Sequence, residues 1–198
     1  MNYYQDITLL PDAEITLGFI WQKVYQQVHI ALADNKIAEN KSAIAVAFPE
    51  YGSKGFPLGS KLRLLAETQE QLEQLDIKKW LERLNDYCHT KPIKAVPANI
   101  EKYVCYKRKQ FKSNLLKEVQ RRAKYKNETL EQALLHFQHY LNSCNLPYIN
   151  MTSLSMLDNQ SKSNKFKLFI EQKILTQSRT GHFNCYGLSK TATTPWFP

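Results

Sequence analysis

The sequence predicts an α+β protein made of two unlike parts. In the first half, short apolar runs of β type alternate with two longer segments whose apolar residues recur every three or four positions, as in helices. In the second half, a strongly basic segment precedes three further β-type stretches. We therefore expect an N-terminal domain over residues 1–98, a basic linker over 99–112 and a C-terminal α/β lobe over 113–198.

Strands and helices are expected to alternate in the first half. The expected bounds are a strand at 2–9, a helix at 15–33, strands at 43–48 and 61–67, a helix at 69–85 and extended chain between 92 and 109, interrupted by Pro97. The stretch 50–60, with three glycines and a proline, is typical of a hairpin loop. The order strand, helix, strand, strand, helix, strand is that of the ferredoxin-like fold, which RNA-recognition (RRM) domains share.

The second half is expected to combine two helices with strands. The expected bounds are helices at 115–126 and 128–142, with Ser113 or Asn114 as the first cap, and strands at 147–155, 165–175 and 182–188. In the first of these helices Lys117, Arg121 and Lys124 recur at i, i+4 and i+7, so they share one face, which Arg122 broadens.

Positive charge is concentrated in one segment. The chain has 27 lysines and arginines against 18 acidic residues, and ten of the basic residues lie between 101 and 126 with only two glutamates. A field this localised favours a polyanionic partner, with nucleic acid first and an acidic membrane second. A solvated helix face with an incidental excess of lysine is the alternative.

Several classes of protein are disfavoured by what the sequence lacks. No apolar run approaches the roughly 18 residues of a membrane span, and the N-terminus does not resemble a secretory signal. The four cysteines form no CxxC pair, so neither a disulfide scaffold nor a zinc ribbon is indicated. We expect a cytoplasmic protein with no membrane association and no cofactor.

The histidines and serines give weak signals by themselves. His136 and His139 lie one turn apart, but no carboxylate or cysteine stands near them, so we expect no metal site. His29 lies at the edge of the apolar stripe of the first helix, where spacing alone favours a structural role. Ser153 and Ser155 would share one face of a strand, but the GxSxG motif of serine hydrolases is absent.

The two ends of the chain are more specific. The run FNCYGLSK at 183–190, followed by PWF at 195–197, and the N-terminal YQDI at 4–7 with a histidine late in the first helix resemble the CRISPR repeat-processing endoribonucleases of the type I-F system. The resemblance spans nearly the whole chain.

This resemblance implies an activity and partners. The family cuts CRISPR precursor RNA without metal, at the 3′ base of the repeat stem-loop. The 2′-hydroxyl upstream of the cut attacks the adjacent phosphate, which gives a 2′,3′-cyclic phosphate and a 5′-hydroxyl. The enzyme retains its product and joins the type I-F surveillance (Cascade-like) complex; outside that complex we expect a monomer.

It also implies residue roles. The catalytic histidine falls on His29, which would take the proton of the 2′-hydroxyl; its unperturbed pKa of about 6.5 suits that task. The active-site serine falls on Ser153, with Ser155 as the alternative, and would position the nucleotide. The tyrosine of the CYG motif falls on Tyr186, which would orient His29.

RNA-binding roles fall on a second set. Arg108 and Gln110 match linker residues that read base edges, because an arginine fork suits guanine and an amide suits adenine. Phe166 matches an aromatic that stacks under the last base pair. The basic helix along the major groove matches Lys117, Arg121, Arg122 and Lys124.

Two rival interpretations remain. One is a catalytically inactive subunit that only binds a CRISPR RNA hairpin, which would need neither His29 nor Ser153. The other is an unrelated basic protein of ribosomal or DNA-associated type, which the C-terminal motif disfavours.

Overall fold

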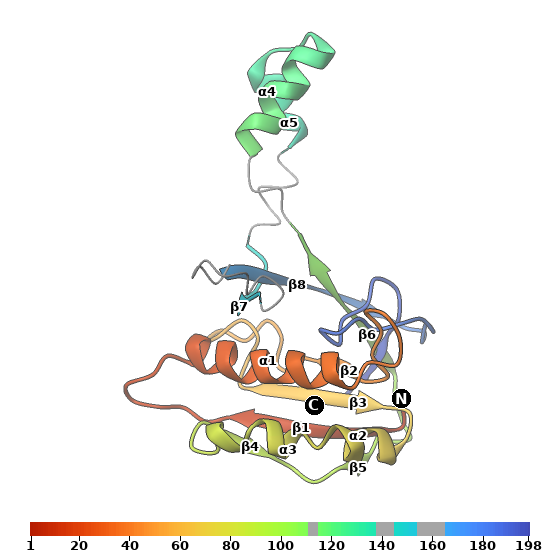
Figure 1. Ribbon diagram of the computed structural model, residues 1–198. Helices are drawn as coiled ribbons and strands as arrows, with labels where there is room; N and C mark the ends of the chain where they lie inside the picture. Colours follow the sequence, from red (N-terminus) through yellow and green to blue (C-terminus); the bar gives the residue numbers. More distant parts are fainter. Residues whose placement is uncertain (111–114, 138–144, 154–164) are drawn as a thin grey trace.

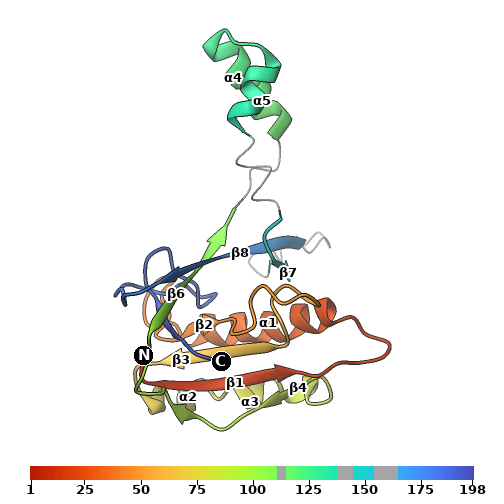
Figure 2. The same ribbon diagram turned by 180° about the vertical axis from the view of Figure 1, so that it is seen from behind.

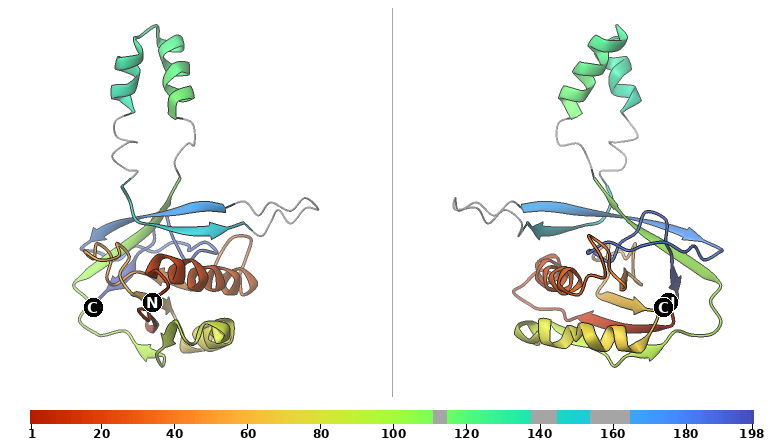
Figure 3. Two further views of the ribbon diagram at one scale, coloured as in Figure 1. Left: turned by 90° about the vertical axis from the view of Figure 1, so that its left-hand side faces the viewer. Right: turned by 45° about the vertical axis from the view of Figure 1, so that its right-hand side comes forward.

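Two antiparallel sheets organise the chain in the computed structural model, which describes residues 1–110, 115–137, 145–153 and 165–198 (Figure 1). The first sheet has the strand order β2-β3-β1-β4, with β5 also paired to β1, and the second has the order β7-β8-β6-β9. Helix α1 lies between the two sheets, and α4 and α5 stand away from both as a pair (Figures 1 and 3).

The elements have the following bounds. In the first half they are β1 (Tyr3–Leu9), α1 (Leu17–Asp34), β2 (Ala45–Ala47), β3 (Lys61–Ala66), α2 (Gln69–Leu75), α3 (Ile77–Trp80), a 3₁₀ turn (Glu82–Leu84), β4 (Cys88–Thr90) and β5 (Lys94–Ala95). In the second half they are β6 (Lys102–Lys109), α4 (Leu115–Lys126), α5 (Leu130–His136), β7 (Tyr148–Thr152), β8 (Lys165–Leu175) and β9 (Thr194–Trp196).

The early elements agree with the sequence pattern. The predicted stripe of α1 is confirmed, because Ile20, Val24 and Val28 are buried against the first sheet. The helix predicted at 69–85 is divided. Thr68 caps its start through the backbone N–H of Gln71, but Asp76 adopts a left-handed φ of 42° that separates α2 from α3.

The extended structure predicted between 92 and 109, with an interruption at Pro97, appears as β5 and β6, but these two strands belong to different sheets. The fourth strand of the first sheet is β4, which pairs with β1 ahead of that stretch, whereas β6 belongs to the second sheet. Pro97 lacks the backbone N–H that a continuous strand ladder needs. The chain therefore leaves the first sheet after β5 and enters the second sheet with β6.

The strands predicted at 147–155 and 165–175 appear as β7 and β8, but the strand predicted at 182–188 is wrong. Those residues form a turn, and Phe183 makes only an isolated bridge to Ser42. The strand that pairs with the second edge of β6 is β9, close to the C-terminus. A polar side chain stabilises the turn: Asn184 Oδ1 accepts from the backbone N–H of Tyr186 and Leu188 at 2.8 and 3.2 Å.

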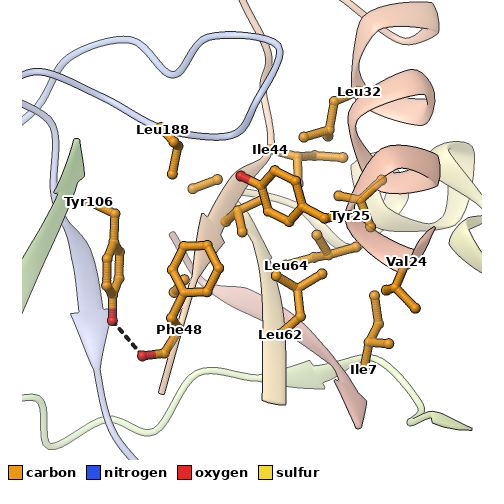
Figure 4. Packing of buried hydrophobic residues seen from close by; sticks show 14 of the residues in the cluster. Ile7, Val24, Tyr25, Leu32, Ile44, Phe48, Leu62, Leu64, Tyr106 and Leu188 are labelled. Atoms are coloured by element: carbon orange, nitrogen blue, oxygen red, sulfur yellow. Dashed lines mark hydrogen bonds between the residues drawn. The ribbon is translucent and has the colours of Figure 1, made fainter. Parts of the chain in front are cut away.

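One hydrophobic core joins the two halves (Figure 4). Tyr106 from β6 packs edge-on against Phe48, and its hydroxyl donates to the Phe48 carbonyl at 2.8 Å. Leu188 and Tyr25 close the same cluster from the C-terminal turn and from α1. The C-terminal segment is thereby fixed against the first sheet and α1.

Buried Arg63 on β3 fixes both ends of the chain to the first sheet. Its guanidinium donates to both carboxylate oxygens of Asp6 at 2.7 and 3.0 Å and to the carbonyls of Phe197 and Pro198 at 2.7 and 3.2 Å. The rings of Tyr4 and Phe197 flank it, with centroids 4.7 and 3.9 Å away. The termini accordingly lie close together (Figure 2).

Candidate active site

His29 lies on the last turns of α1 with its ring half-buried. Its Nδ1 is 2.8 Å from the carbonyl oxygen of Cys185. Because a carbonyl can only accept, Nδ1 carries the proton in this contact and the neutral ring has its lone pair on Nε2. That tautomer gives the imidazole a basic nitrogen on the side away from the protein contact.

The turn that supplies this carbonyl depends on Gly187. The glycine has a φ of 70°, and its N–H donates to the Asn184 carbonyl at 2.7 Å. A Cβ built at this position would overlap Val46, whose backbone N–H donates to the Gly187 carbonyl at 2.9 Å. Only glycine combines this backbone angle with so close an approach.

Tyr186 covers the imidazole from the same turn. The two rings stack with centroids 4.0 Å apart and an interplanar angle of 5°. Tyr25, one turn before His29 on α1 and buried, donates its hydroxyl to the Tyr186 carbonyl at 2.8 Å. The helix therefore holds the turn at two points, and the hydrogen bond to Cys185 and the stacked Tyr186 ring restrict how His29 can rotate.

The second sheet brings a cation and a further aromatic ring to this cluster. The Arg108 guanidinium, from β6, lies 5.1 Å from the Tyr186 ring centroid and 5.3 Å from that of Phe166 on β8. Two residues predicted to bind RNA are thus next to the predicted catalytic pair. Positive charge at this position suits a site that binds phosphate.

The pKa of His29 is lowered from its ordinary value. Burial is the main cause, the hydrogen bond to the Cys185 carbonyl opposes it, and the positive charge of Arg108 lowers the pKa further. A lowered pKa keeps the ring neutral at neutral pH, which is the form a general base needs.

Ser153 follows directly after β7, next to α1. The backbone N–H of Thr152 donates to Gln26 Oε1 at 3.0 Å, and Gln26 lies one turn before His29. The end of β7 is thereby held against the helix that carries His29. Ser155 lies outside the described residues, so the choice between the two serines stays a prediction.

The residues predicted on the basic helix lie on α4, and Gln110 is exposed just after β6. Lys117, Arg121 and Lys124 are exposed, as their shared face predicts. Arg122 instead is half-buried and pairs with Glu128 at 2.6 Å. Arg121 pairs with Glu118 at 2.7 Å on the helix surface, so two of the four predicted cations already have acidic neighbours.

Among residues 1–110, 115–137, 145–153 and 165–198, no group of three or more histidine, cysteine or acidic side chains is arranged to hold a metal ion. No helix in the same ranges has both the length and the apolar character needed to cross a bilayer.

Comparison with known proteins bears on this site. The model of the family described as CRISPR-associated protein (Cas_Csy4) matches residues 4–197. The chain belongs to the Csy4 family. Two relatives named CRISPR-associated endonuclease Cas6/Csy4 match it over all of both chains, with 33% identity in Escherichia coli (strain UTI89 / UPEC) and 30% in Pseudomonas aeruginosa (strain UCBPP-PA14).

Membership of the Csy4 family confirms the resemblance seen in the sequence, and the expectation of a nuclease agrees with the names of both relatives. A solved structure titled "An RAMP protein binding different RNA substrates" aligns over 98% of this chain and 100% of its own, but with 10% identity and a TM-score of only 0.37.

Three residues around this Csy4-family site were missed in the sequence. Tyr25 and Gln26 hold the CYG turn and the end of β7, and Asn184 shapes the turn. A signal existed only for Tyr25, which shares the direction of His29 at i−4 on α1. The roles of the other two depend on contacts between elements distant in sequence.

The electrostatics of the site predict a pH effect in the free protein. An NMR titration of labelled histidines should give His29 a pKa below the ordinary value of about 6.5. Arg108→Gln should raise that pKa, because it removes a positive charge that disfavours the imidazolium. Lys109→Gln makes the same charge change on the same strand but removes an ammonium that lies 3.8 Å from Glu171. If both variants shift His29 equally, Arg108 has no specific effect.

Proposed function

We propose that this protein is a metal-independent endoribonuclease that cleaves CRISPR precursor RNA at the 3′ base of the repeat stem-loop. His29 Nε2 takes the proton from the 2′-hydroxyl upstream of the cut. The resulting oxygen attacks the adjacent phosphate, the bond to the 5′-oxygen of the next nucleotide breaks, and that oxygen takes up a proton from water. The products are a 2′,3′-cyclic phosphate and a 5′-hydroxyl.

The observation that carries this proposal is the orientation of His29. The Cys185 carbonyl holds Nδ1 at 2.8 Å and the Tyr186 ring stacks on the imidazole at 4.0 Å, so Nε2 is available as the base. RNA carries its own nucleophile, so a positioned base and a cation near the phosphate are sufficient for this reaction. Arg108 supplies a cation in the same cluster.

Ser153 is proposed to hold the ribose that bears the 2′-hydroxyl, with Ser155 as the alternative. Its position after β7, which is held to α1 through Gln26, supports this assignment. Phe166 is proposed to stack under the last base pair, and Arg108 and Gln110 to read base edges low in the stem. The ring of Phe166 next to Arg108 supports placing the stem base at this cluster.

We further infer that residues 1–98 form a ferredoxin-like domain, followed by a basic linker and a C-terminal RNA-binding lobe. The order β2-β3-β1-β4, with helices after β1 and β3, supports the ferredoxin-like assignment. After cleavage the protein is proposed to keep its product and join the type I-F surveillance complex in the cytoplasm.

The direct test is cleavage of a labelled repeat hairpin in excess EDTA. We expect cleavage to proceed and to leave a cyclic phosphate, and we expect a single 2′-deoxy nucleotide upstream of the cut to abolish it. Cleavage of the deoxy substrate would exclude attack by the 2′-hydroxyl. Tight binding of the hairpin without any cleavage would make the protein an inactive hairpin-binding subunit.

A second expected result concerns α4, whose exposed cations are proposed to contact phosphates of the stem. Replacing Lys117, Arg121 and Lys124 by alanine should weaken hairpin binding and reduce the salt dependence of the affinity by about one log unit per log of salt for each lost contact. A triple alanine variant of exposed Lys54, Lys91 and Lys94 makes the same charge change elsewhere. Equal losses in both variants would reduce the role of α4 to net charge.

A further inference from the structure

A groove of about 630 Å³ between α1 and α3 has no role in the function proposed above. Lys23, Gln26 and Gln27 line it from α1, and Lys79, Trp80 and Arg83 line it from α3 and the turn that follows. Its volume lies within the range of about 300–1,000 Å³ that is usual for ligand sites.

The lining combines cations with aromatic surface. Lys79 and Arg83 are exposed on one wall beside half-buried Trp80. On the α1 side, Phe19 is 47% exposed and the ammonium of Lys23 lies 5.1 Å from its ring centroid. Cations that follow a backbone together with aromatic rings that stack bases are the pattern of proteins that bind single-stranded nucleic acid.

Two carboxylates partly neutralise the positive charge of the groove. Asp34 and Glu82 also line the groove, so three cations face two acidic groups. The lining thus has a small positive excess, which suits a short, weakly held strand rather than a tightly bound duplex.

The groove and the active site share a stretch of α1. Gln26 lines the groove, and its Oε1 accepts the backbone N–H of Thr152, the residue before Ser153. His29 lies three residues later on the same helix. A strand that leaves the scissile phosphate can therefore reach the groove across Gln26, and Lys23 and exposed Phe19 lie further along α1, toward its first residue.

We propose that this groove binds the single-stranded RNA on the 3′ side of the cleaved phosphate, the part that departs with the 5′-hydroxyl. This inference rests on the proposed cleavage reaction. The enzyme then has two RNA-binding sites. One keeps the hairpin after cleavage, and the other holds the downstream strand only until the RNA is cut. RNA is favoured over a protein partner because three cations line the groove beside the ring of Trp80, with exposed Phe19 next to Lys23.

The test compares two RNAs that differ only downstream of the cut. The precursor carries a 3′ single-stranded extension and a 2′-deoxy nucleotide that prevents cleavage, and the product hairpin ends at the cleavage position. We expect the triple variant Lys23→Ala, Lys79→Ala, Arg83→Ala to bind the precursor roughly tenfold more weakly at low salt, with a salt slope smaller by about 2. Its affinity for the product hairpin should not change.

Phe19→Ala is a second variant that keeps every charge. We expect it to weaken precursor binding several-fold through lost stacking, again with unchanged product binding. The matched control is the triple alanine variant of exposed Lys54, Lys91 and Lys94, which should keep the wild-type difference in affinity between the two RNAs.

The outcomes separate this inference from the proposed function. If wild-type protein fails to bind the product hairpin, the proposed function itself is wrong. If it binds both RNAs and the groove variants do not change the difference between them, the groove does not hold the downstream strand and faces solvent or a protein partner. If both affinities fall together in the groove variants, the cations act through net charge and the inference is overturned.

Discussion

His29→Ala is expected to slow cleavage of the repeat hairpin by about 10²–10⁴-fold, the usual contribution of a general acid–base group. The imidazole has its free Nε2 because the Cys185 carbonyl occupies Nδ1 at 2.8 Å, and alanine provides no base. Hairpin affinity should stay within about twofold of wild type, because the proposed contacts to the RNA lie on other residues. Single-turnover cleavage and equilibrium binding on the same RNA give the two numbers.

Two matched variants make this result specific. His182→Ala removes an exposed histidine and should leave cleavage unchanged. Tyr186→Phe keeps the ring that stacks at 4.0 Å and the backbone carbonyl that Tyr25 contacts, so it should retain most activity. If His29→Ala loses hairpin binding or thermal stability along with cleavage, His29 has a structural role, as spacing alone favours.

Arg63→Met is expected to cost about 3–5 kcal/mol of unfolding free energy, the usual effect of leaving one partner of a buried ion pair without the other. Asp6 is then buried with no cation, and the carbonyls of Phe197 and Pro198 lose their donor. For a chain of this length the melting temperature should fall by roughly 6–20 °C. Urea unfolding and a thermal melt measure both quantities.

The double variant Asp6→Leu, Arg63→Met separates the buried charge from the packing. It removes both ions, so it should recover part of the stability lost in the single variant. Lys94→Met replaces an exposed cation and should leave stability within about 0.5 kcal/mol. A single Arg63 variant as stable as wild type would mean that the carboxylate of Asp6 finds other donors and that Arg63 does not anchor the chain ends.

Much of the fold follows from local pattern. The stripe of α1 and the strands β1, β3, β7 and β8 agree with the periodicity of the sequence, because one face of each element is buried. The errors arise where the outcome depends on partners far away. Residues 182–188 are apolar enough for a strand, but the Asn184 side chain and Gly187 favour a turn. Periodicity likewise gives no information about which sheet β6 joins.

The active site was predicted through motifs rather than chemistry. Its spacing on the helix alone suggests that His29 is a structural histidine. Only its occurrence in the same chain as the CYG run and the end motifs indicates catalysis. The motifs also have a physical basis in the fold. Tyr4 and Phe197 meet with centroids 4.9 Å apart around Arg63, and Gly187 approaches Val46 too closely for any side chain.

By itself, the sequence determined the strand and helix types, the concentration of positive charge and the membership of a family, because each depends on residues that are neighbours along the chain. The tertiary structure decided which residues form the site. His29 and the carbonyl that fixes its tautomer are separated by 156 residues, and Arg108 and Phe166 reach them from another sheet. Such contacts depend on strand pairing and core packing, which no local pattern encodes.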